Sequence, residues 1–453
     1  MELKGMHTVV FGLGKTGEAL VRFLLDRGAR VTVTDSRPAE LLKEALERTR
    51  GLPLEMKLDG HDDRVVENAD LVVLSPGVPH TLACIERAEQ SNIPVIGEIE
   101  LAWRFIDDPV VAVTGTNGKS TTTRLAARML EHSGRSVFLG GNIGKPLAEY
   151  LNENKRSDVV VIEVSSFQLD TIVHFRPEVG VLLNITPDHL DRYADFTAYA
   201  MSKARLFENQ LAGDTAVLNA SDPEVMRVTR GIQSRCCTFN GNTSKPCSAS
   251  VSDAGIFIHT ADGVQIAIDK TMVPMRGRHN LENTAAAALA ALAAGGTKEG
   301  VLSGLAGFAP DPHRLEFVAA VDGVSYYDDS KGTNVEAAAR AVEAMDGPVI
   351  LIAGGRDKFG GYEALREPVR KHVKALIVMG EAAPSISRSL GDIVDTRHAA
   401  SMSEAVTIAS RLARPGDRVL LSPACSSFDM YENYAARGED FNRAVAVLEK
   451  EAI

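Results

Sequence analysis

Short apolar runs that alternate with helical patterns almost from end to end are the feature that most restricts how this chain can fold. Residues 8–11, 30–34 and 70–74 have the composition of buried strands, and residues 18–27 have the spacing of an amphipathic helix. Strands that alternate with helices favour parallel sheets, because two parallel strands must be joined by a long crossover connection. The sequence therefore predicts an α/β protein.

Three domains are expected along the 453 residues, at about 150 residues per domain. A new strand at residues 110–113 places the first boundary near residue 100, and the prolines of FAPDP, residues 308–312, predict a hinge before the last domain. We expect a Rossmann-like first domain, a central P-loop-type domain with a parallel sheet plus small antiparallel strands, and a Rossmann-like third domain. Their predicted limits are residues 1–100, 101–311 and 312–453.

The remaining elements follow from the same patterns. Short alternating runs at residues 255–260 and 264–268 predict the small antiparallel strands of the central domain. Helices are expected at residues 196–208 and at the alanine-rich residues 281–294. Further strands are expected at residues 159–164, 179–184, 324–327, 349–352, 375–379 and 418–421.

Composition narrows the class of protein. Lys and Arg total 49 against 60 Asp and Glu, a net charge of −11, which argues against a general nucleic-acid binder. The longest apolar run has ten residues, 285–294, whereas a membrane span needs about 20. No secretory signal is evident at the start. Five cysteines without CxxC spacing predict reduced thiols in a cytoplasmic protein: Cys84, Cys236, Cys237, Cys247 and Cys425.

The first glycine loop, GLGKTG at residues 12–17, follows a strand and opens a helix. Asp35 ends the next strand 18 residues later. This is the dinucleotide-binding pattern, in which the free amides of a helix start favour a diphosphate. The alternative is a similar turn that holds no ligand. A nicotinamide-dependent oxidoreductase is a rival interpretation, but it needs a nicotinamide site that the rest of the sequence does not show.

A second glycine loop at residues 110–121, VVAVTGTNGKST, predicts an ATP site. Backbone amides of such a loop wrap phosphates, Lys119 supplies a positive charge, and Ser120 or Thr121 can reach Mg²⁺. The loop departs from the common P-loop spacing, because Gly115 stands only three residues before Gly118.

Two downstream positions carry candidate metal ligands. Glu163 lies in an otherwise apolar strand, and a buried carboxylate favours a cation partner such as Mg²⁺. The alternative is a carboxylate paired with a nearby arginine. His189 follows another strand in NITPDHLD, residues 184–191, at the kind of strand end where α/β proteins collect ligands. Taken alone, such a histidine is more often a surface or capping residue.

Six segments together resemble the Mur ligases of peptidoglycan synthesis. They are GTNGKST (115–121), EVSSFQLD (163–170), NITPDHLDRY (184–193), MSKAR (201–205), GRHN (277–280) and DSKGTN (329–334). The resemblance covers the whole chain. Within the family, the GLGKTG start, SPG at residues 75–77 and LSPACSSFD at residues 421–429 resemble the members that add D-glutamate.

The resemblance implies an ATP-dependent ligase of the cytoplasm that joins D-glutamate to UDP-N-acetylmuramoyl-L-alanine through an acyl phosphate. Sister ligases for L-alanine, a diamino acid or a dipeptide remain alternatives. Folate-polyglutamate synthetases lack the first, UDP-binding domain. A non-catalytic ATP-dependent switch protein is a rival of another class. Small-molecule substrates are the expected partners, and the oligomeric state stays open, with a monomer compatible with the sequence.

The resemblance also implies roles for individual residues. Catalytic roles fall to Lys119, His189 and Lys203, with Lys203 carbamylated and either His189 or the carbamate as the base. Two Mg²⁺ ions would be held by Ser120, Glu163, His189 and Lys203. The ATP site would comprise Gly115, Thr116, Asn117, Gly118, Lys119, Ser120, Thr121, Asn280, Asn283, Arg314, Asp329 and Lys331. The UDP substrate would lie on Thr16, Asp35, Ser36, Arg37, Gly77, Asn142, Ser165 and Gln168.

For D-glutamate the family implies Thr333, Lys358, Ser422 and Phe428. Lys358 and Ser422 each follow a predicted strand of the third domain, so they can converge at the carboxyl edge of one sheet although 64 residues separate them. D-Glutamate carries two carboxylates, and its site needs donor groups for both. The alternatives are a lysine in solvent and a serine that caps the next helix.

Overall fold

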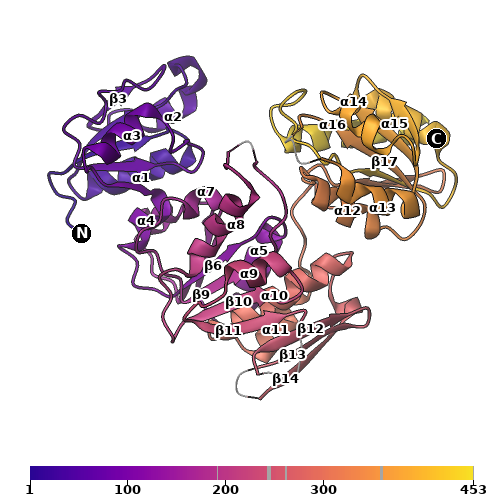
Figure 1. Cartoon of the computed structure of the whole chain (residues 1–453), viewed down its shortest axis with the longest axis horizontal. Helices are drawn as coiled ribbons and strands as arrows, with labels where there is room; N and C mark the ends of the chain where they lie inside the picture. Colours follow the sequence, from indigo (N-terminus) through magenta and orange to yellow (C-terminus); the bar gives the residue numbers. More distant parts are fainter. Residues whose placement is uncertain (191, 242–245, 261–262, 358–360, 452–453) are drawn as a thin grey trace.

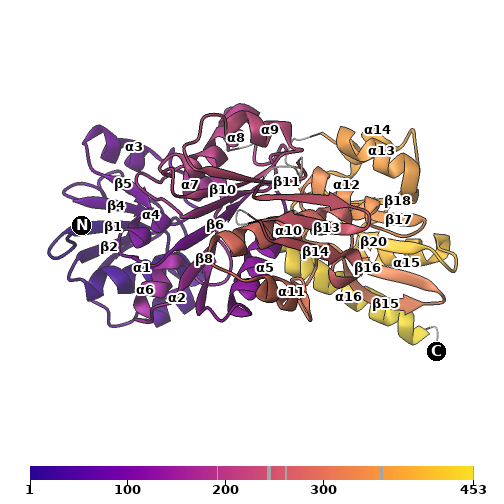
Figure 2. The ribbon, with the colours of Figure 1, turned by 90° about the horizontal axis from the view of Figure 1, so that it is seen from below.

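The computed structural model describes residues 1–190, 192–241, 246–260, 263–357 and 361–451. The chain forms three bodies in sequence order, each built around its own sheet (Figures 1 and 2). The middle body lies between the other two, and the N-terminal and C-terminal bodies stand on either side of it (Figure 1). The predicted α/β fold with parallel sheets is therefore confirmed.

The first body is a five-stranded parallel sheet in the order β3-β2-β1-β4-β5. Its central strands, at residues 7–11 and 71–74, are apolar and almost wholly buried because helices cover both faces, as in doubly wound folds. Its elements are β1 (His7–Phe11), α1 (Lys15–Asp26), β2 (Arg30–Thr34), η1 (Ala39–Leu41), α2 (Lys43–Arg48), β3 (Leu54–Lys57), β4 (Leu71–Leu74), α3 (Ala83–Gln90) and β5 (Val95–Gly97).

The middle body has a nine-stranded sheet in the order β14-β13-β12-β11-β10-β9-β6-β8-β7. Its helices are α4 (Glu98–Trp103), α5 (Lys119–Glu131), α6 (Leu147–Asn152), α7 (Ser166–Leu169), α8 (Phe196–Ala204), η2 (Arg205–Phe207), α9 (Pro223–Val228), η3 (Lys270–Met272), α10 (Arg278–Ala293) and α11 (Lys298–Leu305). Its strands are β6 (Val110–Thr114), β7 (Val137–Gly141), β8 (Val159–Glu163), β9 (Val179–Leu182), β10 (Thr215–Asn219), β11 (Arg235–Phe239), β12 (Ser248–Ser252), β13 (Gly255–His259) and β14 (Gln265–Asp269).

The predicted antiparallel strands of this body are confirmed, since β12, β13 and β14 pair antiparallel. The expectation of reduced thiols is wrong for two cysteines. Cys237 and Cys247 form a disulfide, with Cα atoms 4.8 Å apart, because the parallel pairing of β11 with β12 brings their positions side by side. Sequence spacing alone does not contain that pairing.

The third body has a six-stranded sheet in the order β15-β16-β20-β17-β18-β19, parallel except that β15 runs antiparallel to β16. Its strands are β15 (Glu316–Val321), β16 (Val324–Asp328), β17 (Val349–Gly354), β18 (Val373–Met379), β19 (Asp395–His398) and β20 (Arg418–Leu421). Its helices are α12 (Val335–Glu343), α13 (Glu363–His372), α14 (Ala383–Leu390), α15 (Met402–Leu412) and α16 (Tyr434–Glu451). Over the described residues, no helix is both long and apolar enough to span a membrane.

Candidate active site

The second glycine loop joins β6 to α5 and has the geometry of a phosphate loop. Gly118 has a left-handed φ of 86°, and a Cβ there would lie 2.2 Å from Oδ1 of Asn283, so only glycine fits. Asn184, at the end of β9, holds the loop from the neighbouring strand. Its carbonyl accepts from the Thr116 amide at 2.9 Å and its Oδ1 accepts from the Asn117 amide at 2.8 Å.

Two lysines, the half-buried Lys119 and the buried Lys203, converge on this loop. Lys119 Nζ donates to the carbonyl oxygens of Gly115 at 2.9 Å and Thr116 at 2.8 Å, and Lys203 Nζ donates to the same Gly115 oxygen at 2.9 Å. Lys203 is only 2% exposed. Burial, followed by the charge of Lys119, holds the pKa of Lys203 well below its ordinary value.

Glu163 ends β8 beside these lysines and is 2% exposed. Its Oε1 accepts from Asn142 Nδ2 at 2.7 Å, whereas its buried Oε2 has no hydrogen-bond partner. An unpaired buried carboxylate oxygen is costly unless a cation neutralises it. This oxygen suits a hard cation such as Mg²⁺, so the residues present fit the implied metal.

His189 lies after β9 in a left-handed backbone conformation, with φ of 55°. Its Nε2 lies 3.7 Å from Oδ2 of Asp188, and its ring packs edge-on against Phe167 with centroids 5.0 Å apart. An imidazole beside a carboxylate is a suitable metal ligand or base. The Asp188 carboxylate is itself contacted from the third body, by Asn334 Nδ2 at 3.3 Å.

A cavity of about 450 Å³ adjoins the phosphate loop. The middle body, the hinge segment and the third body all contribute to its walls. Eight of the residues expected to bind ATP line it: Asn117, Gly118, Thr121, Asn280, Asn283, Arg314, Asp329 and Lys331. Four other expected residues belong to the same loop and helix start but are not among the residues that line the cavity: Gly115, Thr116, Lys119 and Ser120.

Sequence reasoning did not predict several of the residues that line this cavity. Phe317 and Tyr327, on the antiparallel strands β15 and β16, line it with ring centroids 5.6 Å apart. His279 lines it too, and burial, with smaller contributions from Arg340 and Arg314, lowers the pKa of its imidazole to about 4. His279 is therefore neutral at pH 7. The alternating pattern of residues 316–328 predicts that the two aromatic side chains share one face of a strand pair. It does not predict which residues of the middle body lie opposite them.

The third body touches the phosphate loop directly. Arg314 Nη2 donates to Ser120 Oγ at 3.0 Å. Asn334, which caps α12, donates from Nδ2 to Asn117 Oδ1 at 3.1 Å. These contacts join residues 194 and 217 positions apart, so the nucleotide cavity exists only when the two bodies meet.

The residues expected to bind D-glutamate are only partly brought together. Ser422 is fully buried, and its hydroxyl donates to Asp329 Oδ2 at 2.7 Å, which ties it to the nucleotide cavity. The Thr333 amide donates to the Lys331 carbonyl at 2.8 Å. Phe428 is 63% exposed on its loop. Lys358 lies outside the described residues.

A second cavity, of about 600 Å³, lies between the first glycine loop and the loop after β7. Six of the residues expected to bind the UDP substrate line it: Thr16, Asp35, Ser36, Arg37, Gly77 and Asn142. Lys15, His61, Ser75, Pro76, Val78 and Pro79 line it as well, without having been expected. Asn142 also binds Glu163, so one side chain links this cavity to the phosphate loop.

Two expected residues lie elsewhere. Ser165 and Gln168 form a capping box at the start of α7, in which the Ser165 hydroxyl accepts from the Gln168 amide and Gln168 Oε1 accepts from the Ser165 amide. Their polar groups are satisfied locally, and they are not among the residues that line the 600 Å³ cavity.

Asp35 lines the 600 Å³ cavity, and its carboxylate accepts hydrogen bonds from the chain itself. Its Oδ2 accepts from the Leu13 amide at 2.7 Å and from Arg37 Nη2 at 2.8 Å, and its Oδ1 accepts from Arg37 N and Nε, both at 2.9 Å. Burial would raise the pKa of Asp35, but these hydrogen bonds outweigh it and lower the pKa to about 2. Asp35 therefore shapes the glycine loop and aims the half-exposed Arg37 at the cavity.

Comparison with known proteins decides the family. The chain is 49% identical over 450 residues to a UDP-N-acetylmuramoylalanine--D-glutamate ligase of Desulfosudis oleivorans, covering 99% of this chain and 98% of that one. It is 46% identical over 448 residues to a protein of the same name from Desulfatibacillum aliphaticivorans, covering 99% and 100%. This chain belongs to the Mur ligase family.

Three Mur ligase family models match in order. They are the Mur ligase MurD-like N-terminal domain at residues 6–97, the middle domain at 113–291 and the glutamate ligase domain at 313–425. The MurF ligase of Thermotoga maritima, solved with ADP, has the same fold, with a TM-score of 0.62 at 18% identity over 99% of this chain and 96% of that one. Mur ligases use ATP, and the oxidoreductase interpretation, which rested on one glycine loop, is not supported.

Proposed function

We propose that this Mur ligase joins D-glutamate to UDP-N-acetylmuramoyl-L-alanine and converts ATP to ADP and phosphate as it does so. The observation that carries the proposal is the link between the two cavities. Asn142 lines the 600 Å³ cavity and donates to Glu163, whose neighbours in the fold are the lysines of the phosphate loop. A substrate bound in the first cavity can thus present its carboxylate beside the phosphates. The names of the relatives supply the amino acid.

The reaction has two steps. The substrate carboxylate attacks the γ-phosphoryl group, which leaves ADP and gives an acyl phosphate. The amine of D-glutamate then attacks the acyl carbon, and the tetrahedral intermediate expels phosphate. Phosphoryl transfer needs mainly in-line positioning and neutralisation of charge. In this chain Lys119 and Arg314 supply positive charge at the phosphate loop.

For Mg²⁺ we propose one site on Glu163 Oε2 with Ser120 and a second on His189 with modified Lys203. Bound there, the metal would neutralise charge on the transferring phosphoryl group. The support is chemical. Glu163 Oε2 is buried without a partner, and His189 lies beside a carboxylate. His189 and the carbamate both remain candidates for the base that takes the proton of the incoming amine.

Carbamylation of Lys203 follows from its surroundings. Lys119 and Lys203 donate to one carbonyl oxygen, and two ammonium groups so close to each other repel. A lowered pKa favours the amine form that reacts with CO₂, and the product would be an anionic oxygen donor suited to Mg²⁺ and to Lys119. Mass spectrometry or ¹³C labelling with bicarbonate at neutral pH tests the modification directly.

The substrate contacts follow the same logic. Thr16, Ser36, Arg37, Gly77 and Asn142 are proposed for the UDP substrate, while Ser165 and Gln168 would act only through their helix cap. Thr333, Lys358 and Phe428 are proposed for D-glutamate, with Ser422 acting through Asp329. The domain limits 1–100, 101–311 and 312–453 and a cytoplasmic location stay predictions.

One experiment tests the proposal. The protein is incubated with ATP, Mg²⁺ and UDP-N-acetylmuramoyl-L-alanine, and phosphate release is measured for a panel of amino acids. D-Glutamate should be strongly preferred to D-glutamine and D-alanine, because a site built for a second carboxylate leaves its own polar groups unpaired with those analogues. Faster phosphate release with L-alanine or a diamino acid would assign the chain to a sister ligase.

A further inference from the structure

The hinge residue Arg314 is held in a strained stretch of backbone. His313 before it and Leu315 after it both have left-handed conformations, with φ of 63° and 47°. Such conformations in residues other than glycine cost about 1 to 3 kcal/mol each and persist only where the surroundings enforce them. The strain therefore has a cause in the contacts around Arg314.

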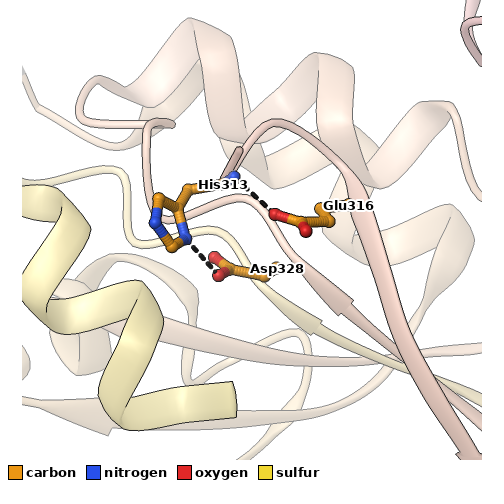
Figure 3. A group of neighbouring side chains, drawn as sticks. All are labelled: His313, Glu316 and Asp328. Atoms are coloured by element: carbon orange, nitrogen blue, oxygen red, sulfur yellow. Dashed lines mark hydrogen bonds and ion pairs between the residues drawn. The ribbon is translucent and has the colours of Figure 1, made fainter. Parts of the chain in front are cut away.

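Four contacts enforce this backbone. The His313 amide donates to Glu316 Oε2 at 2.8 Å, and His313 Nδ1 lies 2.6 Å from Asp328 Oδ2 (Figure 3). The His313 carbonyl accepts from the Lys331 amide at 3.0 Å, and the Leu315 amide donates to Asp329 Oδ1 at 3.3 Å. In Figure 3 the Asp328 carboxylate lies next to the His313 ring, and the Glu316 carboxylate lies next to the His313 backbone amide.

The His313–Asp328 pair is buried against the last helix. His313 is 8% exposed and Asp328 is fully buried. A Cβ at Gly438 of α16 would lie 2.2 Å from His313 Nδ1 and 2.7 Å from Asp328 Oδ2, so the helix backbone presses directly on the pair. In the described part of the chain these two residues and Glu316 bring possible ligand atoms within 4.8 Å of one another, and His313 Nδ1 is engaged by Asp328.

The residue that follows each member of the buried pair lines the nucleotide cavity. Arg314 and Asp329, the sequence neighbours of His313 and Asp328, both line the 450 Å³ cavity. Arg314 reaches on to Ser120 Oγ at 3.0 Å. Asp328 ends β16, where adjacent side chains point to opposite sides of the strand, so fixing Asp328 also fixes the direction of Asp329. In the turn at His313, the contacts that enforce the left-handed backbone fix the direction of Arg314.

We propose that the buried His313–Asp328 pair is a positioning unit that aims Arg314 at the phosphate loop and Asp329 into the nucleotide cavity. Neither residue of the pair touches the cavity, so neither is catalytic. The pair acts on the substrate through its neighbours. The proposal deepens the ATP-binding role of this cavity and rests on it.

The test compares His313→Asn with wild-type protein. Asparagine tolerates the left-handed conformation but is too short to keep the contact with Asp328, so the change removes the pairing and not the backbone fit. We expect kcat/KM for ATP to fall by roughly 10- to 100-fold, as misplacement of a charged group by about 1 Å can do. The KM for UDP-N-acetylmuramoyl-L-alanine should change less than twofold.

A double-mutant cycle asks whether His313 acts through Arg314. If it does, His313→Asn combined with Arg314→Ala should be within about twofold of Arg314→Ala alone, because the second change has nothing left to misplace. Asp328→Asn keeps an oxygen that can accept from His313 and should lose less activity than His313→Asn. It also remains informative if His313→Asn fails to fold.

Lys374→Met is the matched control. It breaks another ion pair of the third body, in which Lys374 Nζ lies 2.7 Å from Asp417 Oδ2, away from the nucleotide cavity. It should lower the thermal midpoint without changing the KM for ATP. If the losses of activity caused by His313→Asn and Arg314→Ala multiply in the double variant, the positioning role is wrong. It is also wrong if His313→Asn raises the KM for ATP and the KM for the UDP substrate equally.

A further measurement separates the two proposals. Metal analysis of purified wild-type protein that found one tightly held transition metal, lost in His313→Asn, would replace the positioning unit with a metal site. Failure of the wild-type protein to bind ADP with Mg²⁺ would contradict the proposed function. Normal ADP binding by both the wild type and His313→Asn would contradict only the present inference.

Discussion

The two glycine loops have the same local design, a strand followed by a glycine turn and a helix, but their charges are handled in opposite ways. At the first loop, all acceptor positions of Asp35 are taken by Leu13 and Arg37. At the second, Glu163 Oε2 has no partner and two lysines share one carbonyl oxygen. A site whose charged groups are already hydrogen-bonded can bind a ligand without changing those contacts. A site whose charged groups lack partners needs charged ligands to pair with them.

The largest expected effect tests this contrast with the lysine of each loop. Lys119→Ala should leave the fold intact and lower turnover by at least about 10²- to 10³-fold, because it removes a buried charge that stabilises the transferred phosphoryl group. Lys15→Ala, in the first loop, is the control and should affect at most the KM for the UDP substrate. Initial rates of phosphate release measure both. Near-normal turnover in a folded Lys119→Ala protein would show that the second loop is not catalytic.

Lys203→Ala should also inactivate the enzyme, but this loss should be partly reversible. A carbamate is a short carboxylate on a lysine stem, so added acetate can occupy the space that the substitution opens and supply the missing oxygen ligand. Activity is measured with and without acetate, using chloride at equal ionic strength as the control. Full activity without any additive would contradict a role for the modified lysine.

Arg37→Ala and Asp35→Ala should act on binding in the first cavity alone. Without Asp35 the Arg37 side chain loses its anchor, and without Arg37 the Asp35 carboxylate loses its main partner. The KM for the UDP substrate should therefore rise roughly tenfold while the KM for ATP stays unchanged. Steady-state kinetics with each substrate varied in turn check this. An equal rise in both constants would mean that the two loops are not separate sites.

The smallest effect concerns stability where α4 packs against α6 in the middle body. Glu98 is buried, its Oε1 accepts from the Ala148 amide at 2.6 Å and its Oε2 has no partner. Burial raises the pKa of Glu98 from 4.5 to about 7. The folded state then holds a proton that the unfolded state has lost between these values, so stability falls as pH rises from about 4.5 to 7.

Glu98→Gln should remove this contribution, at most about 3 kcal/mol, and so stabilise the protein more at pH 8 than at pH 5. Thermal midpoints at the two pH values measure it. Asp329, whose pKa burial raises to about 7, contributes in the same direction and is left in place, so the slope should shrink without vanishing. An unchanged slope would mean that Glu98 is ionised throughout.

Local patterns predicted much of the site. The phosphate loop and Glu163 at the end of β8 were readable, because each depends on elements that are adjacent in sequence. The residues expected at the 600 Å³ cavity came from the family resemblance, since that cavity combines segments far apart in the chain. Ser422 was harder. Its position at a strand end was correct, but its hydroxyl is bound to Asp329, a neighbour that only the order of β16 and β20 in the sheet supplies.

By itself the sequence determined the α/β class, the two glycine loops and the family, because apolar periodicity and contiguous motifs are local properties of the chain. The tertiary structure decided which distant groups share a site. It placed Arg314 and Asn334 on the phosphate loop, Lys203 beside Lys119, and Cys237 against Cys247. These contacts depend on how sheets and bodies pack against one another, and no spacing within a single segment encodes that packing.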